Sequence, residues 1–309
     1  MIVPPANGFP QVSRARSVAV VVGTGKVSPA VAAAFADAGG DALIVGRDVA
    51  RTGDAARKAS TLSKRTVRPA ALEPATFVRA AIVIECVTEE LAVKRSLLTL
   101  VEPWLDPDAL VVTNTSSLPL DEIAQVLRRP GRFAGLHFLH PAHLTGVVEV
   151  IAASRTDKAT VDRLLDLASD MGKRPIVVRR PTAGFVWNRL QMAVLRECLA
   201  LVEEGVADTD AVDAAVSEGL APRWLAAGPL ATADLGGIAV FREIARQLYP
   251  HLSADQEPTA LLDDAEANGG FYEFDAADEV DAETLRAEAL AFASDLARRR
   301  RRPRPRREG

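Results

Sequence analysis

A histidine and a glutamate are the side chains of this sequence best suited to moving a proton. His137 and Glu149 each belong to an apolar run, at 132–138 and 147–151. An imidazole titrates near neutral pH, and a carboxylate on its far nitrogen fixes which ring nitrogen carries the hydrogen. We expect both residues to end strands of a parallel sheet, where the carboxyl edge faces the ligand crevice. The pattern therefore predicts an acid/base pair in that crevice.

A glycine-rich turn predicts where a dinucleotide would bind. Residues 23–28 (GTGKVS) separate an apolar run at 17–22 from an Ala-rich stretch at 29–38. Strand, G-x-G-x-x-G and helix in this order form the dinucleotide-binding turn of α/β proteins. The N–H groups of the following helix then face the phosphates. Taken alone the motif is weak, because a glycine turn also occurs in other α/β proteins. The candidate cofactor residues here are Gly23, Gly25, Lys26 and Ser28, which replaces the third glycine.

The residues after the second predicted strand, 41–45, leave the choice of cofactor open. NAD enzymes usually carry an acid at this point that binds the adenosine ribose. The sequence has Gly46, followed by Arg47 and Asp48. Loss of the acid removes repulsion towards a 2′-phosphate, and Arg47 can pair with one, which favours NADP. Because Asp48 can still reach the ribose, both NAD and NADP remain candidates.

Alternation of apolar runs and helical patterns predicts the fold. A parallel, doubly wound Rossmann-type α/β sheet is expected up to Pro181, because helical patterns lie between most of the strand-like runs. After Pro181 only helical patterns follow, near 184–204, 209–219, 226–249 and 282–300. The expected strands are 17–22, 41–45, 80–86, 109–113, 132–138, 147–151 and 175–178.

Four regions follow from this division. We expect a flexible arm at 1–16, a dinucleotide-binding domain at 17–181, an all-helical C-terminal domain at 182–297 and an Arg/Pro-rich disordered tail at 298–309. The tail has an alternative interpretation as an anion or nucleic-acid contact. A solvated chain end is the simpler interpretation.

Composition narrows the class of protein. The 309 residues carry a net charge of −4, so no broad nucleic-acid footprint is expected. No apolar run approaches the ~18–20 residues of a membrane span, and the first residues lack a signal-peptide pattern, which predicts a cytoplasmic protein. Cys86 and Cys198 lie in apolar runs and are expected as buried thiols without a disulfide. No metal site is expected.

From Ile82 onward the chain resembles the L-3-hydroxyacyl-CoA dehydrogenase family. The likeness covers about residues 17–296, and its motifs keep their order and nearly their spacing. Residues 114–117 match the NTSS motif, and 135–138 with Pro141 resemble HFxNP. The remaining matches are 84–89 with Lys94, 148–151 (VEVI), 184–189 (GFxxNR), 228–229, 233–235 and 270–272.

The resemblance implies a role for each site residue. His137 takes the hydroxyl proton in oxidation, and Glu149 orients its imidazole. Ser116 bonds the reacting oxygen near the nicotinamide, and Asn188 reaches the substrate oxygens from the helical domain. It further implies that Glu89, Lys94 and Asn114 lie along the cofactor. A homodimer built through the helical domain and a place in fatty acid metabolism are also implied.

Two departures from the family pattern bear on the substrate. The asparagine of HFxNP is His140 here, which we expect to contact substrate; His143 is either a second polar wall or a surface residue. Only 36 positions separate Gly46 from Ile82, where family members commonly carry a longer helical pair that touches the CoA nucleotide. Its absence favours an acyl group on a carrier-protein arm or a free hydroxy acid. The short region is basic, which suits an acidic carrier, a CoA phosphate or a solvated face, through Arg51, Arg57, Lys58, Lys64, Arg65 and Arg68.

Three functions therefore compete. The first is an NAD(P)-dependent oxidoreductase that interconverts 3-hydroxyacyl and 3-oxoacyl groups on a CoA or carrier-protein thioester. The second is a gulonate-type dehydrogenase of a free hydroxy acid; the segment 218–224 resembles the GLGxRW of both groups. The third is a degenerate relative that binds a partner without turnover, suggested by Ser28, Gly46 and His140. Trp187 and Trp224 are either walls of an acyl pocket or core residues.

Overall fold

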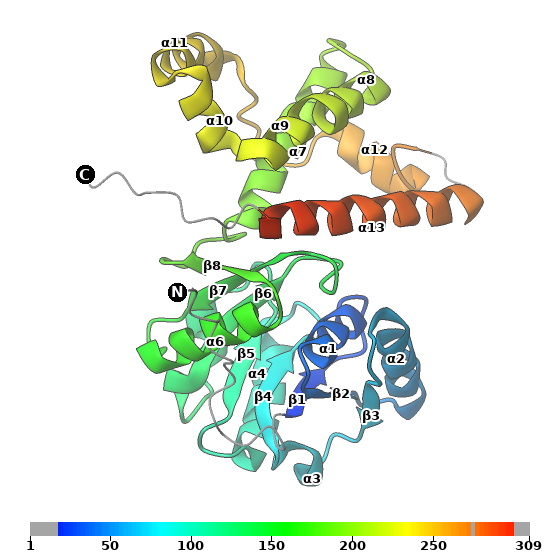
Figure 1. Ribbon diagram of the computed structural model, residues 1–309, viewed down its shortest axis with the longest axis vertical. Helices are drawn as coiled ribbons and strands as arrows, with labels where there is room; N and C mark the ends of the chain where they lie inside the picture. Colours follow the sequence, from blue (N-terminus) through cyan, green and yellow to red (C-terminus); the bar gives the residue numbers. More distant parts are fainter. Residues whose placement is uncertain (1–17, 273–275, 300–309) are drawn as a thin grey trace, which may run out of the picture. The chain divides into compact units, whose positions relative to one another are not determined.

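The computed structural model describes residues 18–272 and 276–299. The chain divides into two compact units (Figure 1). Described residues up to Val186 and from Ala287 onward form the first, called the catalytic unit below. Trp187–Arg286 form the second, called the helical unit. The expected arm at 1–16 and residues 300–309 of the expected tail lie outside the described residues.

An eight-stranded sheet forms the centre of the catalytic unit, in the order β3-β2-β1-β4-β5-β6-β7-β8. All residues of β1 are buried, as its apolar sequence VAVVV requires for a strand covered on both faces. Only β3 was not predicted, since three residues with a central proline give no periodic signal. The strands are β1 (Val18–Val22), β2 (Asp41–Val45), β3 (Arg68–Ala70), β4 (Ala80–Glu85), β5 (Leu110–Thr113), β6 (Phe133–Phe138), β7 (Val147–Ala152) and β8 (Arg174–Val178).

The sheet is not parallel throughout, which corrects the expected position of Glu149. β6 and β7 pair antiparallel, and β8 runs parallel to β7. Glu149 is the third residue of β7 and lies directly opposite His137 of β6. It therefore reaches the catalytic edge from the first half of a reversed strand, not from the carboxyl end of a parallel one.

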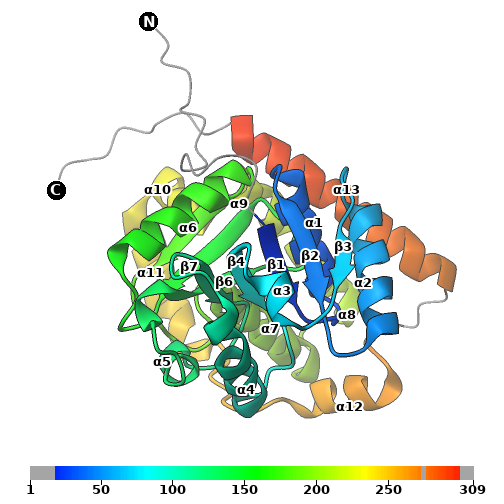
Figure 2. The same ribbon diagram turned by 90° about the horizontal axis from the view of Figure 1, so that it is seen from below.

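Helices cover both faces of the sheet (Figure 2). Alternation along β1 divides the core, because Ala19 and Val21 pack with one set of helices and Val18, Val20 and Val22 with the other. On the first face lie α1 (Ser28–Asp37), α2 (Val49–Leu62) and α6 (Lys158–Asp170). On the second lie α3 (Pro74–Phe77), α4 (Leu91–Val101) and α5 (Leu120–Ala124).

The helical unit contains no strand among its described residues. The helix expected at 226–249 is two helices that meet at Gly237, whose φ of 93° interrupts the first. The helix expected from 184 begins only at Trp187, because Gly184 and Phe185 have positive φ. α12 was not predicted. The helices are α7 (Trp187–Glu203), α8 (Thr209–Ala214), α9 (Ala221–Ala227), α10 (Pro229–Gly236), α11 (Ile238–Leu248), α12 (Ala260–Asn268) and α13 (Ala276–Arg299).

The last part of α13 belongs to the catalytic unit, although the sequence placed residues up to 297 in the helical domain. Ser294 donates a hydrogen bond of 3.0 Å from Oγ to the carbonyl oxygen of Leu144. Across the described ranges, no helix has the length and hydropathy that crossing a membrane requires.

Candidate active site

The antiparallel pairing of β6 and β7 brings His137 and Glu149 together. His137 Nδ1 lies 2.6 Å from Glu149 Oε2, and both side chains are buried. The carboxylate accepts, so Nδ1 carries the hydrogen and Nε2 presents its lone pair. The predicted contact is present, and its geometry is that of an oriented general base.

Two residues just before the helical unit, Phe185 and Val186, contact this pair. The backbone N–H of Val186 donates to Glu149 Oε1 at 2.8 Å, so both carboxylate oxygens have a partner. The Phe185 ring packs against the imidazole, with ring centroids 5.5 Å apart. Phe185 is buried and adopts a φ of 49°, which is rare for a large side chain. Sequence reasoning assigned neither residue to the pair; the GFxxNR motif was the signal.

Ser116 completes the arrangement on the other side of the imidazole. Its Oγ lies 3.2 Å from His137 Nε2, and the hydroxyl donates to that lone pair. A substrate oxygen between the two groups would exchange a proton with Nε2 and accept a hydrogen bond from Ser116. The structure therefore brings together three of the four predicted catalytic residues.

Glu89 fixes the turn that carries Ser116. Its Oε1 accepts hydrogen bonds from Thr115 Oγ1 at 2.5 Å, from Ser116 N at 2.8 Å and from Ser117 N at 3.1 Å. Burial by itself raises the pKa of Glu89, but these donors and the Lys94 charge outweigh it and lower the pKa to about 2. The carboxylate stays ionised at any ordinary pH and positions the serine.

Lys94, predicted to lie along the cofactor, has a buried and fully paired side chain. Its side chain is 1% exposed, and Nζ donates to both oxygens of Glu85, at 2.8 and 2.9 Å. It also lies 3.2 Å from Glu89 Oε2. A buried ammonium needs such counterions, so its donors are directed into the protein. Lys94 thus contacts Glu89, the residue that positions Ser116, and its contact with the cofactor stays a prediction.

Glu85 is a residue that sequence reasoning did not single out. It ends β4, is fully buried and accepts from Thr113 Oγ1 at 2.6 Å and from Val87 N at 2.7 Å. A charged residue at the end of an apolar run was the available signal. With Lys94 it ties β4, β5 and α4 together beneath the predicted nucleotide crevice.

The other predicted site residues lie in several places. Asn114 joins two strands, because its Oδ1 accepts from the N–H of Phe138 at 2.8 Å. His140 is exposed just beyond β6, and His143 has a buried Nδ1 without a hydrogen-bond partner among the described residues. Burial and the nearby Lys173 charge lower the pKa of His143. Asn188 is the second residue of α7 in the helical unit, so its reach to the substrate stays a prediction.

The glycine-rich loop fits the phosphates of a dinucleotide. A Cβ on Gly23 would lie 2.3 Å from the carbonyl oxygen of Cys86, so only glycine fits there. A Cβ on Gly25 would meet nothing within 4 Å, which leaves that backbone open to a ligand. Val27, the N-cap of α1, offers no side-chain hydrogen bond, so the first N–H groups of the helix remain for phosphate oxygens. Ser28 is buried, and its Oγ has no partner among the described residues.

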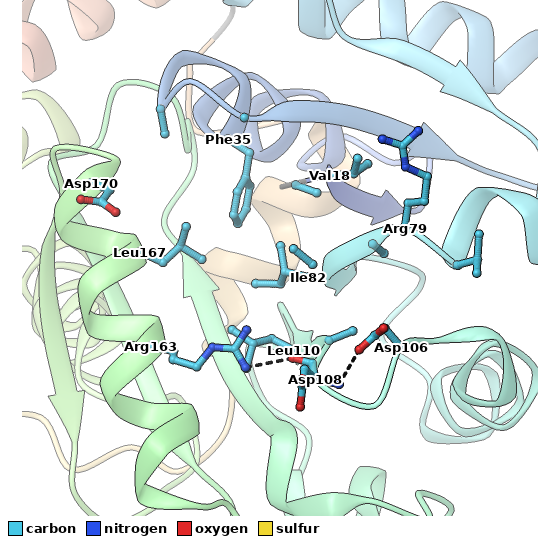
Figure 3. Close-up of a pocket in the computed structure, with 17 residues that line it drawn as sticks. Val18, Phe35, Arg79, Ile82, Asp106, Asp108, Leu110, Arg163, Leu167 and Asp170 are labelled. Carbon is cyan, nitrogen blue, oxygen red and sulfur yellow. Dashed lines mark hydrogen bonds between the residues drawn. The ribbon is translucent and has the colours of Figure 1, made fainter. Parts of the chain in front are cut away.

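A cavity in the catalytic unit lies away from this chemistry (Figure 3). It measures about 740 Å³ and opens at the amino ends of β1, β4 and β5, lined by Val18, Ile82 and Leu110 among others. Ligands of open α/β sheets bind at the opposite, carboxyl edge. None of the predicted site residues lines this cavity, so we place the site at the carboxyl edge, with His137 and the glycine loop.

Fold and site together define a Rossmann-type α/β protein with a hydrogen-bonded histidine–glutamate pair at the carboxyl edge of its sheet. Residues 17–181 match the model of the 3-hydroxyacyl-CoA dehydrogenase NAD binding domain, and residues 184–271 match that of the C-terminal domain of the same enzymes. The chain belongs to the 3-hydroxyacyl-CoA dehydrogenase family.

Similar proteins act on more than one kind of substrate. A relative from Mesorhizobium japonicum, 5-formyl-3-hydroxy-2-methylpyridine 4-carboxylate 5-dehydrogenase, is 33% identical over 56% of this chain and 56% of its own. A crystal structure of an enzyme of that name, described as an NAD⁺-dependent dismutase, has a TM-score of 0.83 and 26% identity, over 92% of this chain and 97% of the other. The crystal structure of (S)-3-hydroxybutyryl-CoA dehydrogenase from Ralstonia eutropha has a TM-score of 0.64 and 26% identity, over 83% of this chain and 96% of the other. The aligned part spans less than two thirds of the first curated relatives it matches.

Proposed function

We propose that this protein is a nicotinamide-dependent dehydrogenase that interconverts 3-hydroxyacyl and 3-oxoacyl groups. The observation that carries the proposal is the placement of His137 between Glu149 Oε2 at 2.6 Å and Ser116 Oγ at 3.2 Å. Membership of the 3-hydroxyacyl-CoA dehydrogenase family supports the reaction class, and the match to its NAD binding domain supports NAD as cofactor.

Side chains of the protein transfer the proton in this reaction. A bound nicotinamide dinucleotide supplies the hydride acceptor or donor. In oxidation, His137 Nε2 takes the hydroxyl proton while Glu149 holds the imidazolium through Nδ1–H. Ser116 donates a hydrogen bond to the same oxygen and keeps it beside Nε2. In reduction, the imidazolium returns the proton to the oxygen.

Substitution of the histidine tests the proposal. We expect His137→Gln to lower kcat by about 10²–10⁴-fold, because the base is lost while the loop that binds the cofactor is untouched. Cofactor affinity, measured by thermal shift, should stay within about threefold of that of the unmodified protein, below the 1.4 kcal/mol that a tenfold change represents. His251→Gln, an exposed histidine of the helical unit, is the matched control. Near-normal turnover of His137→Gln would contradict the assignment of His137 as the general base.

A second candidate substrate is a small free acid that carries a hydroxyl or aldehyde group. Between β2 and β4 the structure has one long helix, α2, then β3 and the four-residue α3. That segment lacks the longer helical pair that the family pattern leads us to expect in an enzyme that binds CoA. The higher TM-score with the enzyme named for a free pyridine carboxylate points the same way.

A substrate panel separates the candidates. It compares kcat/KM for a 3-hydroxybutyryl thioester of CoA, the same thioester on a carrier protein, free 3-hydroxybutyrate, a sugar acid of the gulonate type and an aromatic aldehyde-carboxylate. Preference for either thioester supports the first candidate, and preference for a free acid supports the second. Cofactor binding with no turnover of any of the five would favour the degenerate, binding-only alternative.

We also propose that the protein is a homodimer. One face of α11 presents Ile238, Phe241, Ile244 and Leu248, which are between 36% and 56% exposed. Their spacing of three to four residues makes one continuous apolar stripe, and such stripes in globular proteins are normally covered. A second copy of the chain is the occupant that closed, symmetric association favours.

A further inference from the structure

The end of β2 has no room for an acid. A Cβ on Gly46 would lie 2.6 Å from Thr24 Cγ2 and 2.6 Å from Thr52 Oγ1. Thr52 is itself buried and donates to the carbonyl oxygen of Asp48 at 2.6 Å. A larger residue here would require the side chains of Thr24 and Thr52 to shift, and Gly46 itself has no side chain that could bind a ribose hydroxyl.

The nearest acid at this point is already used by the backbone. Asp48 is the N-cap of α2, and its Oδ1 accepts from Arg51 N at 3.0 Å. A capping carboxylate of this kind stabilises the helix by about 1 kcal/mol. Turning Oδ1 towards a ribose would cost that stabilisation, so Oδ2 is the oxygen of Asp48 that remains for a ribose hydroxyl.

A basic hollow adjoins the glycine loop on the side of α2. It has a volume of about 280 Å³ and is lined by Thr24 and Gly25 of the loop and by three cations, Lys26, Arg51 and Lys58. No ion pair joins these three side chains to an acid within the part of the chain that the structure describes. The acid that lines it, Asp54, pairs with Arg57. The hollow therefore carries net positive charge beside the glycine loop.

We propose that this hollow binds the 2′-phosphate of NADP(H), so that the protein binds NADP(H) more tightly than NAD(H). Lys26 and Arg51 hold the phosphate from the loop and from the first turn of α2, and Lys58 adds charge about two turns further along the helix. Arg47 is exposed just after Gly46, and the acid next to it, Asp48, accepts a hydrogen bond from the backbone of Arg51. The inference rests on the proposed function, because it assumes a dinucleotide at the glycine loop.

Binding of cofactors and of their adenosine fragments tests the site without turnover. Titration calorimetry with NADPH, NADH, 2′,5′-ADP and 5′-AMP should give affinities at least about tenfold higher for each phosphorylated ligand, the effect of one charge-assisted contact. In the double variant Lys26→Ala/Arg51→Ala this preference should fall to about threefold or less.

Arg65→Ala is the matched control, since Arg65 is an exposed cation beyond the far end of α2 and outside the hollow. It should keep the full preference. Tighter binding of NADH than of NADPH, or a preference that survives in the double variant, would overturn the phosphate site while the proposed dehydrogenase stands. Binding of neither cofactor would overturn both.

Discussion

The two units of the chain differ in how completely each buries its own apolar residues. In the catalytic unit every residue of β1 is buried, and both faces of the sheet carry helices. In the helical unit α9, α10 and α11 have no buried residue, and Leu230 and Leu235 of α10 are more than 80% exposed. Burial of apolar surface is the main stabilising contribution to a fold. The catalytic unit thus buries its own core, whereas these helices of the helical unit keep large apolar side chains exposed.

The same contrast applies to charge. The catalytic unit contains buried ions, and two buried pairs, Glu85 with Lys94 and Glu149 with His137, lie near the proposed reacting groups. The helical unit has no charged residue that is buried among those described. Among the described residues, buried charge is therefore confined to the catalytic unit. The predictions below test this difference, from the largest expected effect to the smallest.

Glu149→Gln should produce the largest change. The amide cannot match both the Nδ1–H of His137 and the N–H of Val186 as two carboxylate oxygens do. We expect kcat to fall by about 10²–10⁴-fold, since the imidazole loses its tautomer and the partner of its charged form. Steady-state kinetics at constant cofactor saturation measures the effect. A loss smaller than about fivefold would contradict the role, because acid/base assistance exceeds that.

Lys94→Met should destabilise the catalytic unit by about 3–5 kcal/mol, since it leaves the carboxylate of Glu85 buried without its counterion. Urea unfolding followed by circular dichroism measures this. The double variant Lys94→Met/Glu85→Met should regain much of the loss, because two apolar side chains replace the ion pair. Equal stability of Lys94→Met and the unmodified protein would show that the pair is not needed.

Lys173 predicts a dependence of stability on pH. Its side chain is 4% exposed and donates to the carbonyl oxygens of Ala142 and Thr145, each at 2.6 Å, which fixes the segment after β6. Burial lowers the pKa of Lys173 from 10.5 to about 8. Between these values the unfolded chain binds more protons than the folded one, so stability rises with pH in that window.

Relative to Lys173→Met, the unmodified protein should gain about 2 kcal/mol of unfolding free energy between pH 7 and 9.5. Urea titrations at the two pH values measure the gain. Lys158→Met removes an exposed lysine and should show no such difference from the unmodified protein. A flat difference curve for Lys173→Met would mean that the buried amine keeps its ordinary titration.

Phe241→Asp should have the smallest effect on the catalytic unit and a clear effect on assembly. The ring is 36% exposed, so we expect the unfolding free energy of the catalytic unit to change by less than about 0.5 kcal/mol. Sedimentation should show particles at the 32.9 kDa chain mass instead of twice that value. Arg242→Asp places the same carboxylate beside the stripe and should remain dimeric. An unmodified protein that sediments as a monomer would contradict the dimer.

Local sequence determined most of the elements and the identity of the acid/base residues. Continuous apolar runs predicted every strand except β3, and the glycine turn lies between β1 and α1 as its spacing required. Such features depend on residues close together in the chain, where period and turn chemistry act directly. The family motifs added His137, Glu149 and Ser116, which the structure places in one hydrogen-bonded group.

Tertiary structure decided the features that depend on distant residues. The reversal of β7 sets Glu149 opposite His137, and apolar periodicity does not reveal strand direction. Lys94 turns inward because Glu85, nine positions earlier, is buried beside it. Lys26 and Arg51 share one hollow only because α1 and α2 pack on the same face of the sheet. Strand register, burial of charge and helix packing arise from contacts across the whole unit. The residue types therefore indicate the chemistry, and the fold determines which of these residues come into contact.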